Sequence, residues 1–279
     1  FRSSCGQAKR DGMTYHINYA YTCHVGKVRP NNEDNFWCCG ERLPASNQGI
    51  AEIRTGIRLR ESLPVLAVFD GMGGESQGEM AAGLASEALE TFYKANKGML
   101  RKTPELFLRE ACREMNQAVC TYGREQRISA MGTTIAMIAF GKKEAHICNL
   151  GDSRIYQLSG TDFSQISRDH VLKSYRFGKA PLTQFLGVEE TEMKLEPSIG
   201  TLPYLDGDRY LLCSDGVTDM LSDREIKEIM QMEGPVRDLV QALLEKVLEK
   251  GARDNTTIIL CEVKQDEWPL RTWLLQNRK

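Results

Sequence analysis

Residues 133–158 read TTIAMIAFGKKEAHICNLGDSRIYQL and contain three strand-like runs: Thr133–Phe140, Glu144–Leu150 and Arg154–Leu158. Isoleucine, alanine and other apolar residues dominate each run, and short polar turns such as GKK at 141–143 separate them. Successive strands joined by turns this short predict antiparallel hairpins. We therefore expect an antiparallel sheet in the middle of the chain.

Helical patterns lie on both sides of these strands. Gln77–Lys94 repeats apolar residues every four positions, and a second pattern begins at Pro104, with Thr103 as its N-cap. Further along, Ser222–Glu225 matches a capping box, and Pro235–Lys250 carries an apolar face. Helices in pairs and strands in hairpins favour an α+β fold: a four-layer α-β-β-α sandwich of two mainly antiparallel sheets flanked by helix pairs.

We expect residues 1–279 to form a single domain of this kind. Gly40–Leu63 is polar and charged, which predicts an exposed hairpin or an insertion. Val171–Leu202 has little periodicity, which is typical of a flap over a site or of a plain surface loop. Residues 264–279 form a C-terminal tail that is apolar for a terminus. The remaining strand-like runs are Thr14–Cys23, Asn35–Cys39, Pro64–Asp70, Arg209–Cys213 and Thr256–Val263.

Composition limits the class of protein. The chain has 279 residues and a net charge of −2, with 41% hydrophobic and 27% charged residues, which argues for a globular protein and against a nucleic-acid binder. No run approaches the roughly 20 apolar residues of a membrane span, and Phe1–Arg10 lacks the apolar centre of a signal peptide. Nine cysteines without a C-x-x-C pair favour reduced, buried thiols. We expect a cytoplasmic protein.

Acidic residues recur where apolar strands begin or end. A carboxylate at such a place is costly to bury unless it is paired or bound to a metal. Oxygen ligands suit Mg²⁺ or Mn²⁺ and disfavour zinc. A single Asp-Gly after a strand is ordinarily a turn, and spacing alone does not show that the carboxylates converge. The residues concerned are Glu33, Asp34, Asp70, Asp152, Asp215 and Asp254.

Short motifs spread from residue 29 to residue 257 resemble, in order, those of the metal-dependent protein phosphatases of type 2C. Each motif alone is weak, but their common order is specific, and the DGMGG form is similar to the bacterial branch. The family fold is an α-β-β-α sandwich, in agreement with the pattern of helices and strands. The matching stretches are Arg29–Asn35 (RPNNEDN), Val68–Gly74 (VFDGMGG), Met131–Thr134 (MGTT), Asn149–Arg154 (NLGDSR), Ser167–His170 (SRDH), Leu212–Asp219 (LCSDGVTD) and Asp254–Thr257 (DNTT).

The resemblance implies a site for two or three Mg²⁺ or Mn²⁺ ions. Asp70 would bridge two ions, and Asp215 and Asp254 would complete the ligands of the first. Asp152 would help to bind a third, weaker ion.

The second ion would be held by Glu33 or Asp34, partly through water, together with the carbonyl oxygen of Gly71. Arg29 would grip the substrate phosphate as a bidentate donor. This assignment makes the loop before Asn35 part of both the metal site and the substrate site.

The mechanism expected of such a site is hydrolysis of phosphoserine and phosphothreonine in proteins by a metal-activated water, without a phosphoenzyme. A serine/threonine protein kinase is one candidate partner. Many eukaryotic members have a histidine, often proposed as the general acid, where this chain has Met72, so the leaving group must take its proton from elsewhere. The expected catalytic residues are Arg29, Asp70 and Asp215.

Two other interpretations have some support. Cys23 and Arg29 fit the C-x₅-R phosphate loop of cysteine-dependent phosphatases, in which a thiolate attacks phosphorus. That loop should open a helix, but Pro30 follows Arg29 at once. The second alternative is a non-catalytic phosphoprotein-binding or regulatory module of the same fold, against which the complete acidic set argues.

Overall fold

Two six-stranded sheets form the centre of the molecule. The structure, a computed structural model, describes residues 14–50, 52–73, 77–128, 130–173, 178 and 180–266. The first sheet has the order β3-β1-β12-β11-β8-β9, and in the second β5 joins the path β10-β7-β6-β4-β2 by pairing with β4. Every pairing between these strands is antiparallel.

Most strands agree with the predicted runs, but β3, β5, β9 and β10 were not predicted as separate strands. The first sheet holds β1 (Tyr15–His24), β3 (Arg54–Leu59), β8 (Arg154–Ser159), β9 (Asp162–Gln165), β11 (Arg209–Cys213) and β12 (Thr256–Gln265). The second sheet holds β2 (Asp34–Cys38), β4 (Val65–Gly73), β5 (Met131–Thr133), β6 (Ile135–Phe140), β7 (Glu144–Leu150) and β10 (Ser198–Pro203).

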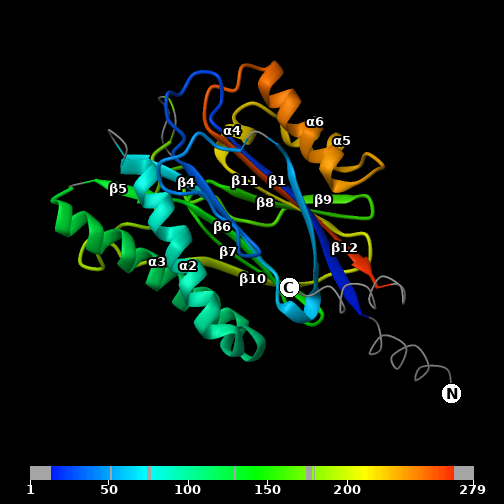
Figure 1. The fold of residues 1–279 in the computed structure, drawn as a ribbon, viewed down its shortest axis with the longest axis horizontal. Helices are drawn as coiled ribbons and strands as arrows, with labels where there is room; N and C mark the ends of the chain where they lie inside the picture. Colours follow the sequence, from blue (N-terminus) through cyan, green and yellow to red (C-terminus); the bar gives the residue numbers. More distant parts are fainter. Residues whose placement is uncertain are drawn as a thin grey trace.

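Helices cover the outer face of each sheet (Figure 1). A pair packs on the second sheet: α2 (Gln77–Lys102) and α3 (Pro104–Gln126). Three helices pack on the first sheet: α4 (Asp215–Thr218), α5 (Asp223–Met230) and α6 (Val236–Glu249). A short 3₁₀ helix, η1, spans Arg60–Ser62.

Three hydrophobic cores lie between the four layers and hold them together. One lies between the helix pair and the second sheet, one between the two sheets, and one between the first sheet and α4–α6. Phe36 and Tyr210 are buried between the sheets, whereas Phe69 faces α2 and α3. Strands covered on both faces are apolar throughout, as β6 (IAMIAF) is. The predicted α-β-β-α sandwich is confirmed.

One local prediction is wrong. The strands β6 and β7 do form a hairpin, but β7 and β8 do not pair, because β7 belongs to the second sheet and β8 to the first. The chain changes sheets at Gly151, whose φ of +98° lies in the left-handed region that suits glycine. A Cβ there would also stand 2.6 Å from the side chain of Thr134. The turn that carries Asp152 is therefore a crossing between sheets.

Other segments differ from expectation in extent. Helix α2 continues past Lys94 to Lys102, with a non-helical Asn96 inside it. Gly40–Leu63 supplies β3, an edge strand on β1, and the end of the segment predicted as a flap belongs to β10. The capping box of Ser222 and Glu225 is present.

Some predictions fall partly outside the described residues. The tail is described only as far as 266, and 174–177 and 179 of the flap are not described. All described cysteines are free, and all except Cys39 are buried, whereas Cys5 lies outside the described part. None of the described helices combines the length and apolar character needed to cross a membrane.

Candidate active site

Asp34 and Asp70 face each other across the paired strands β2 and β4. Only 2% of Asp34 is exposed, and its Oδ2 atom accepts hydrogen bonds of 2.7 Å from Ser214 Oγ and 2.7 Å from Thr257 Oγ1. Burial, and then the charge of Asp70, raise the pKa of Asp34 well above its usual range. Two carboxylates are thus held at one edge of the second sheet.

Ser214 and Thr257 bring the first sheet to the same place. The Ser214 N–H donates to the Thr257 carbonyl at 3.2 Å, and the Thr257 N–H donates to Ser214 Oγ at 2.9 Å. Asp215 follows Ser214 as the first residue of α4 and is 4% exposed. The hydroxyls on Asp34 therefore connect β2 to the strand ends that carry Asp215 and Asp254.

The glycines after Asp70 and Asp215 are not turn residues, so the turn interpretation is wrong at both places. Gly71 continues β4, and a Cβ there would lie 2.1 Å from the Gly78 carbonyl oxygen at the start of α2. Gly216 lies in α4, and a Cβ there would lie 1.9 Å from the Asn255 carbonyl oxygen. Both glycines permit backbone segments to approach at the site.

Asn255 organises the loop between β1 and β2, a role that sequence reasoning missed. Its Oδ1 accepts the Glu33 N–H at 2.8 Å, and its amide donates to the carbonyls of Val25 at 2.8 Å and Asn31 at 2.9 Å. Asn255 is 4% exposed. The sequence signal for this role was the Asp254-Asn255 pair directly before a strand. A buried amide side chain needs several hydrogen-bond partners, so it fixes the backbone segments that supply them.

Arg29 projects from the loop that Asn255 holds. Its Nη2 atom lies 2.7 Å from Asp254 Oδ2, in an ion pair whose side chains are 50% and 28% exposed. The hydrogen bond from Arg29 to Asp254 raises the pKa of Arg29, and the charges of Glu33 and Asp70 act in the same direction. Burial raises the pKa of Glu33, which Arg29 partly offsets. One guanidinium therefore faces three carboxylates.

Asp152 is tied to Asp70 through two hydroxyls. Thr134 Oγ1 accepts the Asp70 N–H at 3.1 Å and lies 2.6 Å from Ser153 Oγ. On the other side, the Gly151 N–H donates to His170 Nδ1 at 3.2 Å. His170, in the SRDH stretch, thereby helps to position the turn that carries Asp152.

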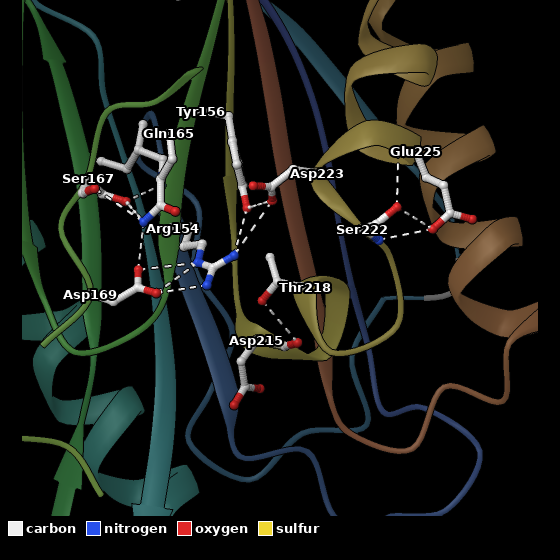
Figure 2. A network of polar contacts seen from close by, with 11 residues as sticks. Arg154, Tyr156, Gln165, Ser167, Asp169, Asp215, Thr218, Ser222, Asp223 and Glu225 are labelled. Atoms are coloured by element: carbon white, nitrogen blue, oxygen red, sulfur yellow. Dashed lines mark hydrogen bonds and ion pairs between the residues drawn. The ribbon is translucent and has the colours of Figure 1, made fainter. Parts of the chain in front are cut away.

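A second polar group lies beside the site, around Arg154. The Arg154 Nη2 atom is 2.8 Å from Asp169 Oδ2, and Nη1 donates to Tyr156 Oη at 3.0 Å. Tyr156 donates in turn to Asp223 at 2.8 Å, and Gln165 donates to Asp169 at 2.6 Å. Figure 2 shows the guanidinium between Asp169 and the Tyr156–Asp223 pair, with the Asp215 side chain pointing away. We call Arg154, Tyr156, Gln165, Asp169 and Asp223 the Arg154 network.

Five candidate metal ligands lie on or beside the strand ends described above. We call them the carboxylate cluster: Glu33, Asp34, Asp70, Asp215 and Asp254. Its donor atoms are oxygens, as Mg²⁺ and Mn²⁺ prefer. Among the described residues, no three histidine, cysteine, aspartate or glutamate side chains converge closely enough to hold a metal ion. Two carboxylates are held by protein groups instead: Asp34 by hydroxyls and Asp254 by Arg29. The cluster fits the chemistry of a hard cation, and these two side chains would have to leave their partners to bind one.

The thiolate alternative does not fit this geometry. Cys23 is fully buried; its Sγ accepts a hydrogen bond from the Asn32 amide at 3.1 Å and lies 3.2 Å from Thr257 Oγ1. Burial, with the nearby charge of Asp34, raises the pKa of the Cys23 thiol to about 12. An attacking thiolate needs a lowered pKa and access to substrate, so Cys23 is a packed thiol.

Comparison with known protein sequences gives matches to one family. The model of the family described as protein phosphatase 2C matches residues 54–256. The serine/threonine phosphatase stp of Listeria welshimeri is 29% identical over 253 residues, which cover 85% of this chain and 92% of that protein. The serine/threonine protein phosphatase PstP of Mycobacterium tuberculosis is 30% identical over 264 residues, which cover 90% of this chain and 46% of that protein.

The fold comparison gives the same answer. The catalytic domain of a serine/threonine protein phosphatase PstP, solved in complex with two manganese ions, matches with a TM-score of 0.71 and 29% identity. The match covers 90% of this chain and 100% of that one. Since the family model also matches well over half of the sequence, the chain belongs to the protein phosphatase 2C family.

Proposed function

We propose that this chain, a metal-dependent protein serine/threonine phosphatase of that family, hydrolyses phosphoserine and phosphothreonine in proteins with a metal-activated water and without a phosphoenzyme. The observation that carries the proposal is the facing pair Asp34 and Asp70, with Asp215 and Asp254 brought beside it by Ser214 and Thr257. A protein holds several carboxylates together at a cost in stability unless a ligand neutralises them.

We assign the metal ligands as follows. Asp70 would serve two metal sites, Asp215 and Asp254 would complete the first, and Asp152 would contribute to a third. The observations in support are the burial of Asp215 and the hydrogen bonds that connect the Asp70 backbone through Thr134 to Ser153, the neighbour of Asp152.

The second site takes Glu33 or Asp34 together with the Gly71 carbonyl oxygen. Two contacts support this assignment: the Gly71 N–H donates to the Glu33 carbonyl at 3.1 Å, and a Cβ on Gly78 would stand 2.9 Å from Glu33 Oε2. The glycines at 71 and 78 therefore leave room for the Glu33 carboxylate beside the backbone of β4.

Mg²⁺ or Mn²⁺, when bound, supplies Lewis-acid chemistry that activates water and offsets negative charge on the phosphoryl group. The two manganese ions in the PstP structure make Mn²⁺ the first ion to test. Arg29 binds the phosphate oxygens, since a guanidinium matches their geometry with two parallel hydrogen bonds. Met72 has no proton to donate to the leaving oxygen, so we assign it no acid–base role.

Substrate, partner and cellular compartment are proposed on the basis of the reaction and of the free cysteines. We propose phosphoproteins as substrates, a serine/threonine kinase among them, and a cytoplasmic location that suits the free cysteines. We also propose that residues 1–279 form one domain, because the first sheet pairs β1 with β12, from the two ends of the described chain, and packs on the second sheet. Deletion of the protein should raise phosphorylation of a kinase, and unchanged phosphorylation of every kinase would contradict that partner.

The test is hydrolysis of a phosphothreonine peptide by the full chain. Activity should require Mn²⁺ or Mg²⁺, disappear with EDTA, and disappear in Asp215→Asn. Cys23→Ser is the matched control and should keep its activity. Activity that ignores EDTA but disappears in Cys23→Ser would overturn the proposal in favour of a thiolate.

The second candidate is a non-catalytic phosphoprotein-binding module of the same fold. Capture of phosphoproteins without turnover under any metal condition would favour it. The complete set of acidic residues at the strand ends favours the enzyme.

A further inference from the structure

The ion pair between Arg29 and Asp254 joins two residues to which the proposed function gives separate roles. Arg29 is the phosphate-binding group and Asp254 a metal ligand, yet the Nη2–Oδ2 distance of 2.7 Å places them in direct contact. The negative charges of Glu33 and Asp70 also act on Arg29 and raise its pKa, though less than Asp254 does. The guanidinium of Arg29 therefore supplies positive charge beside the carboxylate cluster.

The backbone around Arg29 is held by hydrogen bonds, whereas its side chain reaches into solvent. Asn255 holds the carbonyls of Val25 and Asn31, and the Lys27 N–H donates to the Ala252 carbonyl at 2.8 Å. The Arg29 side chain is nevertheless half exposed. A long side chain on an anchored loop can leave one partner for another without any rearrangement of the fold.

We propose that Arg29 is a counter-ion latch: its guanidinium and a divalent cation compete for the Asp254 carboxylate, so that cation binding releases Arg29 toward the substrate phosphate. The latch rests on the proposed function, since it takes Asp254 as a metal ligand. Competition at one carboxylate couples the two events, so cation binding favours the engagement of phosphate by Arg29, and phosphate binding favours the cation equally.

The expected size of the effect follows from the exposure of the pair. A half-exposed ion pair contributes little, so its removal should tighten cation binding by roughly three- to fivefold. Removal of any nearby positive charge also tightens cation binding a little through long-range attraction. The test must separate these two effects.

Lys27 provides the matched control. It lies on the same loop, and its Nζ donates to the Leu248 carbonyl at 2.9 Å. Lys27→Ala removes one positive charge near the site, as Arg29→Ala does, but leaves the contact with Asp254 intact. Arg29→Lys keeps the charge and loses the planar guanidinium.

The experiment is calorimetric titration of the full chain with Mn²⁺ alone. We expect Arg29→Ala to bind Mn²⁺ at least threefold more tightly than wild type, Arg29→Lys to lie between them, and Lys27→Ala to change affinity less than twofold. Equal tightening in Arg29→Ala and Lys27→Ala would overturn the latch in favour of a general charge effect, and unchanged or weaker binding in Arg29→Ala would overturn it outright.

Peptide hydrolysis, measured on the same variants, distinguishes failure of the latch from failure of the proposed phosphatase function. If wild type binds Mn²⁺ and turns over substrate while Arg29→Ala binds no more tightly, the latch fails and the proposed function stands. If folded wild type binds no Mn²⁺ and shows no turnover, both fail.

Discussion

The carboxylate cluster and the Arg154 network lie near each other but differ in what neutralises their charge. In the network, Asp169 receives a bidentate guanidinium and an amide, and Asp223 receives a hydroxyl. In the cluster, the fully buried Asp34 receives hydroxyls, and Glu33, Asp70 and Asp254 face the half-exposed Arg29. Carboxylates paired inside the protein stabilise the fold, whereas carboxylates gathered with too little positive charge are typical of a ligand site.

The largest difference in activity between the carboxylate cluster and the Arg154 network should appear when one carboxylate of each is replaced by asparagine. We expect Asp70→Asn to lower turnover of a phosphothreonine peptide by at least about 100-fold, because it removes the proposed bridging ligand. Its stability should be unchanged or higher, since Asp34 loses a facing negative charge. Asp223→Asn is the control and should stay active. Full activity in Asp70→Asn would contradict the proposal that the carboxylate cluster is the metal site.

The converse change tests the network. Asp169→Asn should lower the free energy of unfolding by roughly 1.5–3 kcal/mol, because Arg154 loses its charged hydrogen-bond acceptor. Mn²⁺ affinity should change less than threefold, since the cluster is untouched. Urea unfolding and calorimetry measure the two quantities. A variant that kept its stability but lost Mn²⁺ binding would show that the network belongs to the site.

The hydroxyls on Asp34 should show an intermediate effect. Ser214→Ala removes one of two hydrogen bonds to a buried carboxylate and should destabilise the fold by about 1–2 kcal/mol. Thr257→Val, which is nearly isosteric, should do the same, and the double variant should lose more than the sum because Asp34 then has neither donor. Additive losses in urea unfolding would mean that the two hydroxyls act independently.

The smallest effect concerns a carboxylate paired at the surface. A hydrogen bond from Lys250, assisted by the Ser222 N–H, lowers the pKa of Glu225 from 4.5 to about 2. A lowered carboxyl pKa adds stability that is complete above the unfolded value and lost as pH falls toward the folded value. The stability difference between wild type and Glu225→Gln should therefore be constant from pH 7 to 5 and shrink between pH about 4.5 and about 2. Urea unfolding across this range measures it, and a difference that grew on acidification would contradict the pairing.

The layered fold could be predicted because its signals are local. Apolar strand runs, the helix repeat after Gln77 and the capping box at Ser222 each lie within a few residues of sequence. The change of sheet between β7 and β8 could not be predicted. The two runs are joined by a short turn, as in a hairpin, and only the pairing of β7 with β6 and of β8 with β11 shows that the chain crosses to the other layer.

For the proposed site, the sequence by itself predicted the candidate residues, from the acidic residues beside strands and the order of their motifs. The tertiary structure decided what those residues touch. Asp34 meets Ser214 and Thr257, which lie 180 and 223 residues away, and Arg29 meets Asp254 across 225 residues. Such contacts depend on how two sheets pack, because charge, hydrogen bonding and burial act through space, whereas a sequence pattern records only neighbours along the chain.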